Sequence, residues 1–131
     1  MKSIQLLTAI VGLAASFASA QAWAGANDYA FEAVAPDVRS GPGSELSVRL
    51  VHKPDGKPVE GAIVFRTRLD MSPDNMEAMT TPVELSSSTV PGVYNFRGDL
   101  TMDGKWALKL QAKVQGEPET VQGAVVFTAK K

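Results

Sequence analysis

Residues 103–114 read DGKWALKLQAKV. The Asp103-Gly104 pair is among the strongest short-range signals for a hairpin turn. After it, apolar residues occupy every second position from Trp106 to Val114, and the intervening positions from Lys109 onward are polar. A strand with one buried face has this period of two. The stretch therefore predicts a hairpin whose second strand packs Trp106 into the core of a β fold.

The chain on either side of this hairpin has the same character. Short alternating stretches are separated by turn signals such as Pro54-Asp55-Gly56 and Gly116-Glu117-Pro118. In one stretch we expect Ile63, Phe65 and Leu69 to share the core face. Strands are expected at 29–34, 46–50, 63–69, 94–96, 106–114 and 121–127. With about seven strands at this spacing, the sequence predicts an all-β, immunoglobulin-like β-sandwich.

The first 24 residues have the pattern of a secretory signal peptide. Lys2 provides a positive start, residues 4–17 are almost entirely apolar, and two A-x-A cleavage sites follow, at 18–20 and 22–24. The alternative is an uncleaved membrane anchor, but the apolar stretch is shorter than the ~20 residues that a spanning helix needs.

We therefore expect residues 1–24 to be a cleavable signal peptide and residues 25–131 to form the sandwich domain. We also expect the mature domain to be a periplasmic monomer that does not insert into the membrane.

The charge of the chain limits the classes of partner it can bind, and its cysteine content limits how it can be stabilised. Removal of the signal would take away Lys2 and no acid, which leaves 12 basic residues against 14 acidic ones and a net charge of −2. This balance does not favour nucleic acid or an anionic membrane surface as a partner. The chain has no cysteine, so packing alone must stabilise it.

One segment, residues 70–79, interrupts the alternating pattern. It reads DMSPDNMEAM, and Ser72 followed by Pro73 is typical of a helix start. We expect one or two helical turns, or a structured loop, at an end of the sandwich. In a helical turn Met76 and Met79 would share a face.

The sequence does not favour catalysis. His52 is the only histidine, no cysteine is present, and no serine lies in a nucleophile-elbow setting. Carboxylates are scattered over turns and strand ends, where they are usually solvated. We therefore expect that the protein is not an enzyme.

Methionines offer the one distinctive chemistry. Met71, Met76, Met79 and Met102 lie in the mature domain, three of them within nine residues. Thioethers are soft ligands that select Cu(I), and by the same softness Ag(I), over hard ions. The alternatives are that these residues fill gaps in the core or contact a partner protein. His52, at a strand end, is either a further ligand or a solvated surface residue.

Four segments resemble the YtkA-like/FixH-like family of exported domains. They are residues 55–62 (DGKPVEGA), 76–79 (MEAM), 91–94 (PGVY) and 102–106 (MDGKW). Their order and spacing match over about Leu46 to Phe127, which is most of the mature chain.

The resemblance implies an immunoglobulin-like sandwich and an accessory role in bacterial metal handling. Family members look like partners or modules of heavy-metal efflux systems or of copper supply to cytochrome oxidase. On this basis Met76, Met79 and Met102, which fall on the family's motifs, are candidate copper(I) ligands, and Met71 joins them by proximity. The alternative is a metal-free interaction module that docks on an efflux or oxidase-assembly partner through the same methionine-rich end.

We predict that the protein is exported and cleaved after Ala20 or Ala24, because both residues end an A-x-A site that follows the apolar stretch. Mass spectrometry of the protein isolated from the periplasm should find a new N-terminus at Gln21 or Gly25. Full-length protein that stays with membranes through a carbonate wash would contradict the prediction.

Overall fold

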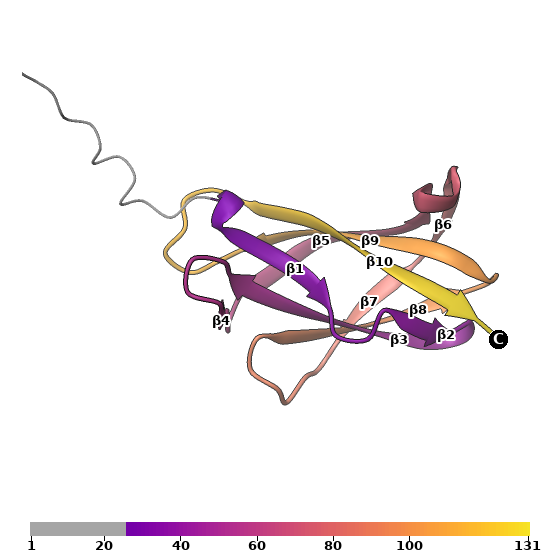
Figure 1. Cartoon of the computed structure of the whole chain (residues 1–131), viewed down its shortest axis with the longest axis horizontal. Coiled ribbons are helices and arrows are strands. Elements are labelled where there is room, and N and C mark those ends of the chain that lie inside the picture. Colours follow the sequence, from indigo (N-terminus) through magenta and orange to yellow (C-terminus); the bar gives the residue numbers. More distant parts are fainter. Residues whose placement is uncertain (1–25) are drawn as a thin grey trace, which may run out of the picture.

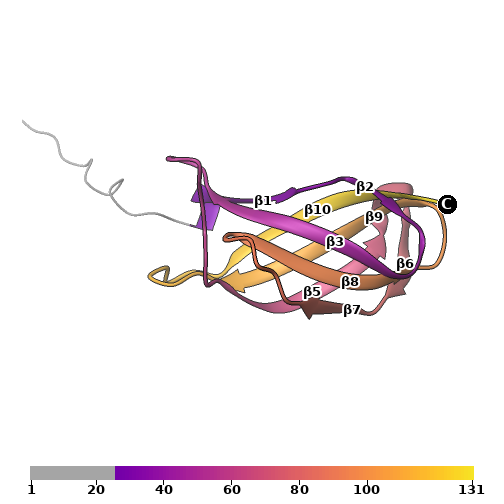
Figure 2. The ribbon, with the colours of Figure 1, turned by 90° about the horizontal axis from the view of Figure 1, so that it is seen from below.

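The computed structural model describes residues 26–131, which form two facing β-sheets (Figures 1 and 2). The expected signal peptide lies outside the described residues. Within residues 26–131, no helix has the length and apolar character needed to cross a membrane.

The first sheet has the strand order β1-β3-β8-β7, with the short strand β4 paired to β3. All of its pairings are antiparallel. Its strands are β1 (Tyr29–Ala33), β3 (Gly41–His52), β4 (Lys57–Pro58), β7 (Val83–Ser86) and β8 (Val93–Leu100).

The second sheet has the strand order β2-β10-β9-β5-β6 and is antiparallel except for the parallel pairing of β2 with β10. Its strands are β2 (Asp37–Arg39), β5 (Ile63–Met71), β6 (Met76–Thr81), β9 (Gly104–Lys113) and β10 (Val121–Lys130). Two 3₁₀ turns accompany the sheets, η2 (Ala26–Asp28) and η3 (Ser72–Asp74).

The strand order confirms the predicted immunoglobulin-like sandwich. In that fold, strands ABED form one sheet and CFG the other. Here β1, β3, β8 and β7 take the ABED places, and β5, β9 and β10 take the CFG places. The described residues contain ten strands, more than the seven or so that were expected. Several of the additional strands are short or lie at sheet edges, where alternation gives little signal.

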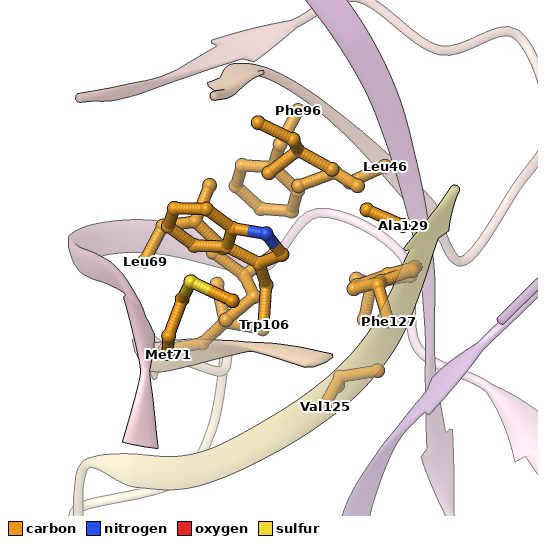
Figure 3. Close-up of a cluster of buried hydrophobic side chains, with 12 residues drawn as sticks. Leu46, Leu69, Met71, Phe96, Trp106, Val125, Phe127 and Ala129 are labelled. Carbon is orange, nitrogen blue, oxygen red and sulfur yellow. The ribbon is translucent and has the colours of Figure 1, made fainter. Parts of the chain in front are cut away.

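The core fills the space between the sheets. Trp106 and Phe96, one from each sheet, are fully buried, as the alternation around Trp106 predicted. Figure 3 shows the Trp106 ring beside Met71 and Leu69, with Phe96 and Leu46 facing it from the other sheet. The indole Nε1 of Trp106 donates a hydrogen bond of 3.1 Å to the carbonyl oxygen of Met102, so the ring's one polar atom is satisfied.

The prediction for Ile63 and Phe65 was wrong. Both side chains are exposed, at 66% and 49%, and Val64 instead packs against the core. The register between β5 and β9 shifts between Val64 and Arg66, so Phe65 has no partner on β9. Such a bulge reverses which side chains face inward, and a pattern read with a strict period of two cannot reveal it.

Replacing Trp106 with alanine should lower the free energy of unfolding by about 3–5 kcal/mol, because it opens a cavity at the centre of the core. Denaturant unfolding followed by circular dichroism measures this change. A variant that unfolds at the wild-type midpoint would show that Trp106 does not anchor the core.

Candidate metal site

The candidate site lies at the end of the sandwich where η3 and β6 meet the turn between β8 and β9. Figures 1 and 2 both place this turn and β6 at the same end as the C-terminus. The backbone N–H of Lys105 donates to the Asp74 carboxylate at 2.9 Å, which fastens η3 to the start of β9. This end therefore brings together residues from two distant parts of the sequence.

Gly104 lets η3 and the turn approach closely. Its φ of +139° lies in a region that L side chains rarely adopt. A Cβ at this position would lie 2.6 Å from the Met71 Cε and 2.6 Å from an Asp74 carboxylate oxygen. The Asp103-Gly104 pair thus does more than turn the chain, because a side chain at position 104 would strain the backbone and displace the side chains of Met71 and Asp74.

Met71 belongs to the core rather than to the surface of this end. Its side chain is fully buried and lies beside Trp106 (Figure 3). Met71 thus fills space in the core, which is one of the two alternatives to metal binding given above for the methionines. We therefore do not retain it as a ligand of an accessible metal ion.

The other three methionines are partly accessible. Met76, Met79 and Met102 are each 37% exposed. Met76 pairs with Met71 across β5 and β6, and Met102 supplies the carbonyl that Trp106 binds. Met76 and Met102 are thus tied to the same part of the core. Met79 follows Met76 on β6, so all three methionines lie at one end of the sandwich.

The expected helical arrangement of Met76 and Met79 was wrong. The helical part of the segment is limited to η3, and both methionines lie on strand β6. The N-cap of η3 is Met71, not Ser72. Asn75, with a φ of +60°, ends the turn in the left-handed conformation. The chain then returns along β5, and the register shift between Asp70 and Met71 leaves residues 77–79 without partners on β5.

Met102 also lines a separate hollow of about 740 Å³. Its walls include the stretch Ser40–Pro42, Asp99 and Asp103, but neither Met76 nor Met79. Met102 thus also borders a hollow to which Met76 and Met79 do not contribute.

His52 lies away from the methionines. It ends β3 beside β4, and Figure 1 places these strand ends at the opposite end of the sandwich from β6. Its Nδ1 is 3.0 Å from the Asp55 carboxylate, and its ring centroid is 5.1 Å from that of Tyr29. The structure therefore does not bring His52 to the methionine-bearing end.

A buried carboxylate organises the base of the methionine-bearing segment. Asp70 is fully buried, and its Oδ2 accepts hydrogen bonds from Arg68 Nε at 2.7 Å and from Lys109 Nζ at 3.0 Å. Its Oδ1 accepts the backbone N–H of Ser72 at 3.0 Å, which holds the start of η3. Arg68 donates a further bond of 3.1 Å to the carbonyl oxygen of Glu77 on β6. Asp70 thus connects η3 and, through Arg68, β6 to the sheet.

The hydrogen bonds keep Asp70 ionised. Burial alone would raise the pKa of its carboxyl, but hydrogen bonds from Ser72, Arg68 and Lys109 outweigh burial and hold the pKa well below its usual range. The sequence analysis missed this residue, because an aspartate at a strand end usually faces solvent. The sequence does carry one signal for the ion pair. Arg68 and Asp70 are two residues apart on one strand, so their side chains lie on the same face and can meet.

Thioethers are the soft metal ligands that this end offers. Within residues 26–131, histidine, cysteine, aspartate and glutamate form no group of three or more that could hold a metal ion. A set made of thioethers alone would suit a soft monovalent ion such as Cu(I) or Ag(I) and would bind Zn²⁺ or Ca²⁺ poorly.

Comparisons with known proteins give a family match and a distant structural similarity. The model of the family described as YtkA-like matches residues 24–111. No curated protein matches the chain significantly. Among solved structures, the C-terminal domain of ZirS is similar with a TM-score of 0.43 and 10% sequence identity, over 100% of this chain and 88% of that one. A likeness of this degree says nothing about function.

Replacing Asp70 with asparagine should destabilise the protein by about 1.5–3 kcal/mol at neutral pH, because charge-assisted hydrogen bonds are lost. The lowered pKa also predicts an acid-dependent loss of stability. The ionised Asp70 stabilises the fold above the unfolded-state pKa of about 3.9, and this contribution is lost as the pH falls toward the lower folded-state pKa. Urea unfolding at several pH values measures both effects.

The control is Asp37→Asn on β2, where the carboxylate is exposed. The control should unfold like the wild type at neutral pH, and the Asp70 variant should lose less stability than the wild type upon acidification. If the two variants behave alike, the buried network does not stabilise the fold.

Proposed function

Because the chain belongs to the YtkA-like family, we propose that it is an exported accessory domain that binds Cu(I), or Ag(I), through Met76, Met79 and Met102. The observation that carries the proposal is the position of these three partly exposed thioethers, which come from two distant segments and lie at one end of the domain. The domain performs no catalysis in this proposal. Its partner is a heavy-metal efflux or copper-delivery protein.

The chemistry of an exported domain supports thioethers as the ligands. A thioether carries no proton and does not form disulfides, so it remains a ligand in an oxidising compartment where thiolates are lost. Binding through thioethers releases no proton. The affinity should therefore stay constant over about pH 5–8, where an imidazole ligand would lose its affinity on protonation.

The partial exposure of the three methionines supports exchange of the ion. A delivery protein must release its metal to a partner, so its ligands have to be reachable from outside. Met76 and Met79 lie on β6, the edge strand of its sheet, and Met102 lies in a turn. A site of this kind would hold Cu(I) at the surface of the domain.

Titration of the purified protein with Cu(I), under anaerobic conditions and against a chromogenic Cu(I) chelator, tests the proposal. Met76→Leu combined with Met79→Leu removes two sulfurs and should abolish binding. Met102→Leu should weaken it. Leucine conserves the apolar volume, so each substitution should cost less than about 1.5 kcal/mol of stability.

Two control variants match this experiment. Met71→Leu removes a sulfur that is buried, and His52→Gln removes an imidazole at the other end of the sandwich. Both should bind Cu(I) like the wild type. Unchanged affinity in the Met76/Met79 double variant would instead favour the metal-free interaction module.

A further inference from the structure

The outer face of the second sheet carries a concentration of positive charge. Trp106, Leu108 and Leu110 of β9 face the core, so the residues between them face outward. Cross-strand register places the cations of β5 on this same outer face, because Arg66 pairs with Gln111 and Arg68 with Lys109. The outward-facing cations of the two strands are Arg66, Arg68, Lys105, Lys109 and Lys113.

The acidic residues near this face are already engaged. Asp70 is buried beneath Arg68 and Lys109, and the Glu77 carboxylate lies 3.9 Å from Lys109. Arg66 makes no ion pair or side-chain hydrogen bond with any residue in the range 26–131. A free positive charge therefore remains on a domain whose mature net charge is negative.

The face is hollowed where the cations gather. A depression of about 480 Å³ lies over β5, β9 and β10. Two cross-strand rows form it, Arg66-Gln111-Gln122 and Arg68-Lys109-Ala124. Ala124 keeps the floor low, and the longer side chains supply the walls. The amides of Gln111 and Gln122 have no partner within the described part of the chain, so the walls present unused hydrogen-bond donors.

We propose that this depression, which we call the basic hollow, binds an extended acidic segment of a partner protein. Arg66 and Arg68 are two residues apart on one face of a strand, hence separated by about 6.7 Å. Carboxylates at alternate positions of an extended peptide have the same separation. Such a peptide lies along β5 and β9. One of its carboxylates pairs with the unengaged guanidinium of Arg66, and the next reaches the N–H groups of Arg68 that Asp70 and the Glu77 carbonyl leave unused.

The basic hollow is distinct from the methionine-bearing end, and the proposal does not depend on copper. It assigns partner recognition to the sheet face and leaves the exposed thioethers free. The proposed function can therefore fail while this proposal stands, and the reverse also holds.

Fluorescence anisotropy with a short labelled peptide of alternating Glu and Ala tests the proposal on the purified, metal-free protein. The peptide should bind at low ionic strength and dissociate as salt is added. A matching peptide of alternating Gln and Ala should not bind. Equal binding of the two peptides, or no binding of the acidic one, would overturn the proposal.

Arg66→Gln should weaken binding of the acidic peptide about tenfold or more, because it removes a charge-assisted bond. This exposed side chain is outside the Asp70 network, so the variant should keep the wild-type melting temperature. Arg97→Gln is the matched control. Arg97 is also exposed, but it lies on the opposite sheet, where the register places it between Glu45 and Glu84. An equal loss of affinity for the acidic peptide in both variants would show that binding is not specific to the basic hollow.

A labelled oligothymidylate of matching charge separates protein from nucleic acid as the source of the anion. It should bind more weakly than the acidic peptide, because the donors are arranged for carboxylates on an extended polypeptide. Tighter binding of the oligothymidylate would contradict a protein partner.

Discussion

The ion network around Asp70 holds together the segments on which both proposed binding surfaces lie. The carboxylate is fully buried, and such a group is tolerated only where charged donors surround it. Arg68, Lys109 and the backbone of Ser72 supply these donors. Through Ser72 the network fixes η3, and through Arg68 it reaches β6, the strand that carries two of the three exposed methionines. Arg68 and Lys109 also form one wall of the basic hollow. Asp70 therefore holds two of the positively charged side chains of that face in place.

Much of the fold could be predicted from the sequence because the strands around the core obey a period of two. Trp106 and the apolar residues after it lie where alternation put them, and Asp103-Gly104 does turn the chain. Prediction failed where local geometry departs from a regular strand. Phe65 lies in a bulge, and Met76 and Met79 lie on a strand with displaced register. Bulges depend on pairing with a distant strand, which no short window of sequence contains.

For the candidate site, the sequence named the methionines but not where their side chains lie. Counting soft donors in a chain without cysteine gave four methionines, and the resemblance to the YtkA-like family singled out Met76, Met79 and Met102, which the fold gathers at one end; that they bind metal stays a prediction. Whether a given methionine faces the core or the solvent depends on its neighbours in space. Met71 lies only five residues before Met76, yet it is buried beside Trp106. His52 could not be placed from its position at a strand end, because either end of a sandwich can receive such a residue. Asp70 was missed because its partners include Lys109, 39 residues further along the chain.

X-ray absorption at the copper edge, on the Cu(I)-loaded protein, tests the central claim most directly, because it reports which atoms surround the ion. The account predicts a first shell made only of sulfur, since Met76, Met79 and Met102 contribute nothing but thioethers. A first shell that contains nitrogen or oxygen would contradict it, because the ion would then be bound by imidazole or carboxylate groups elsewhere on the domain.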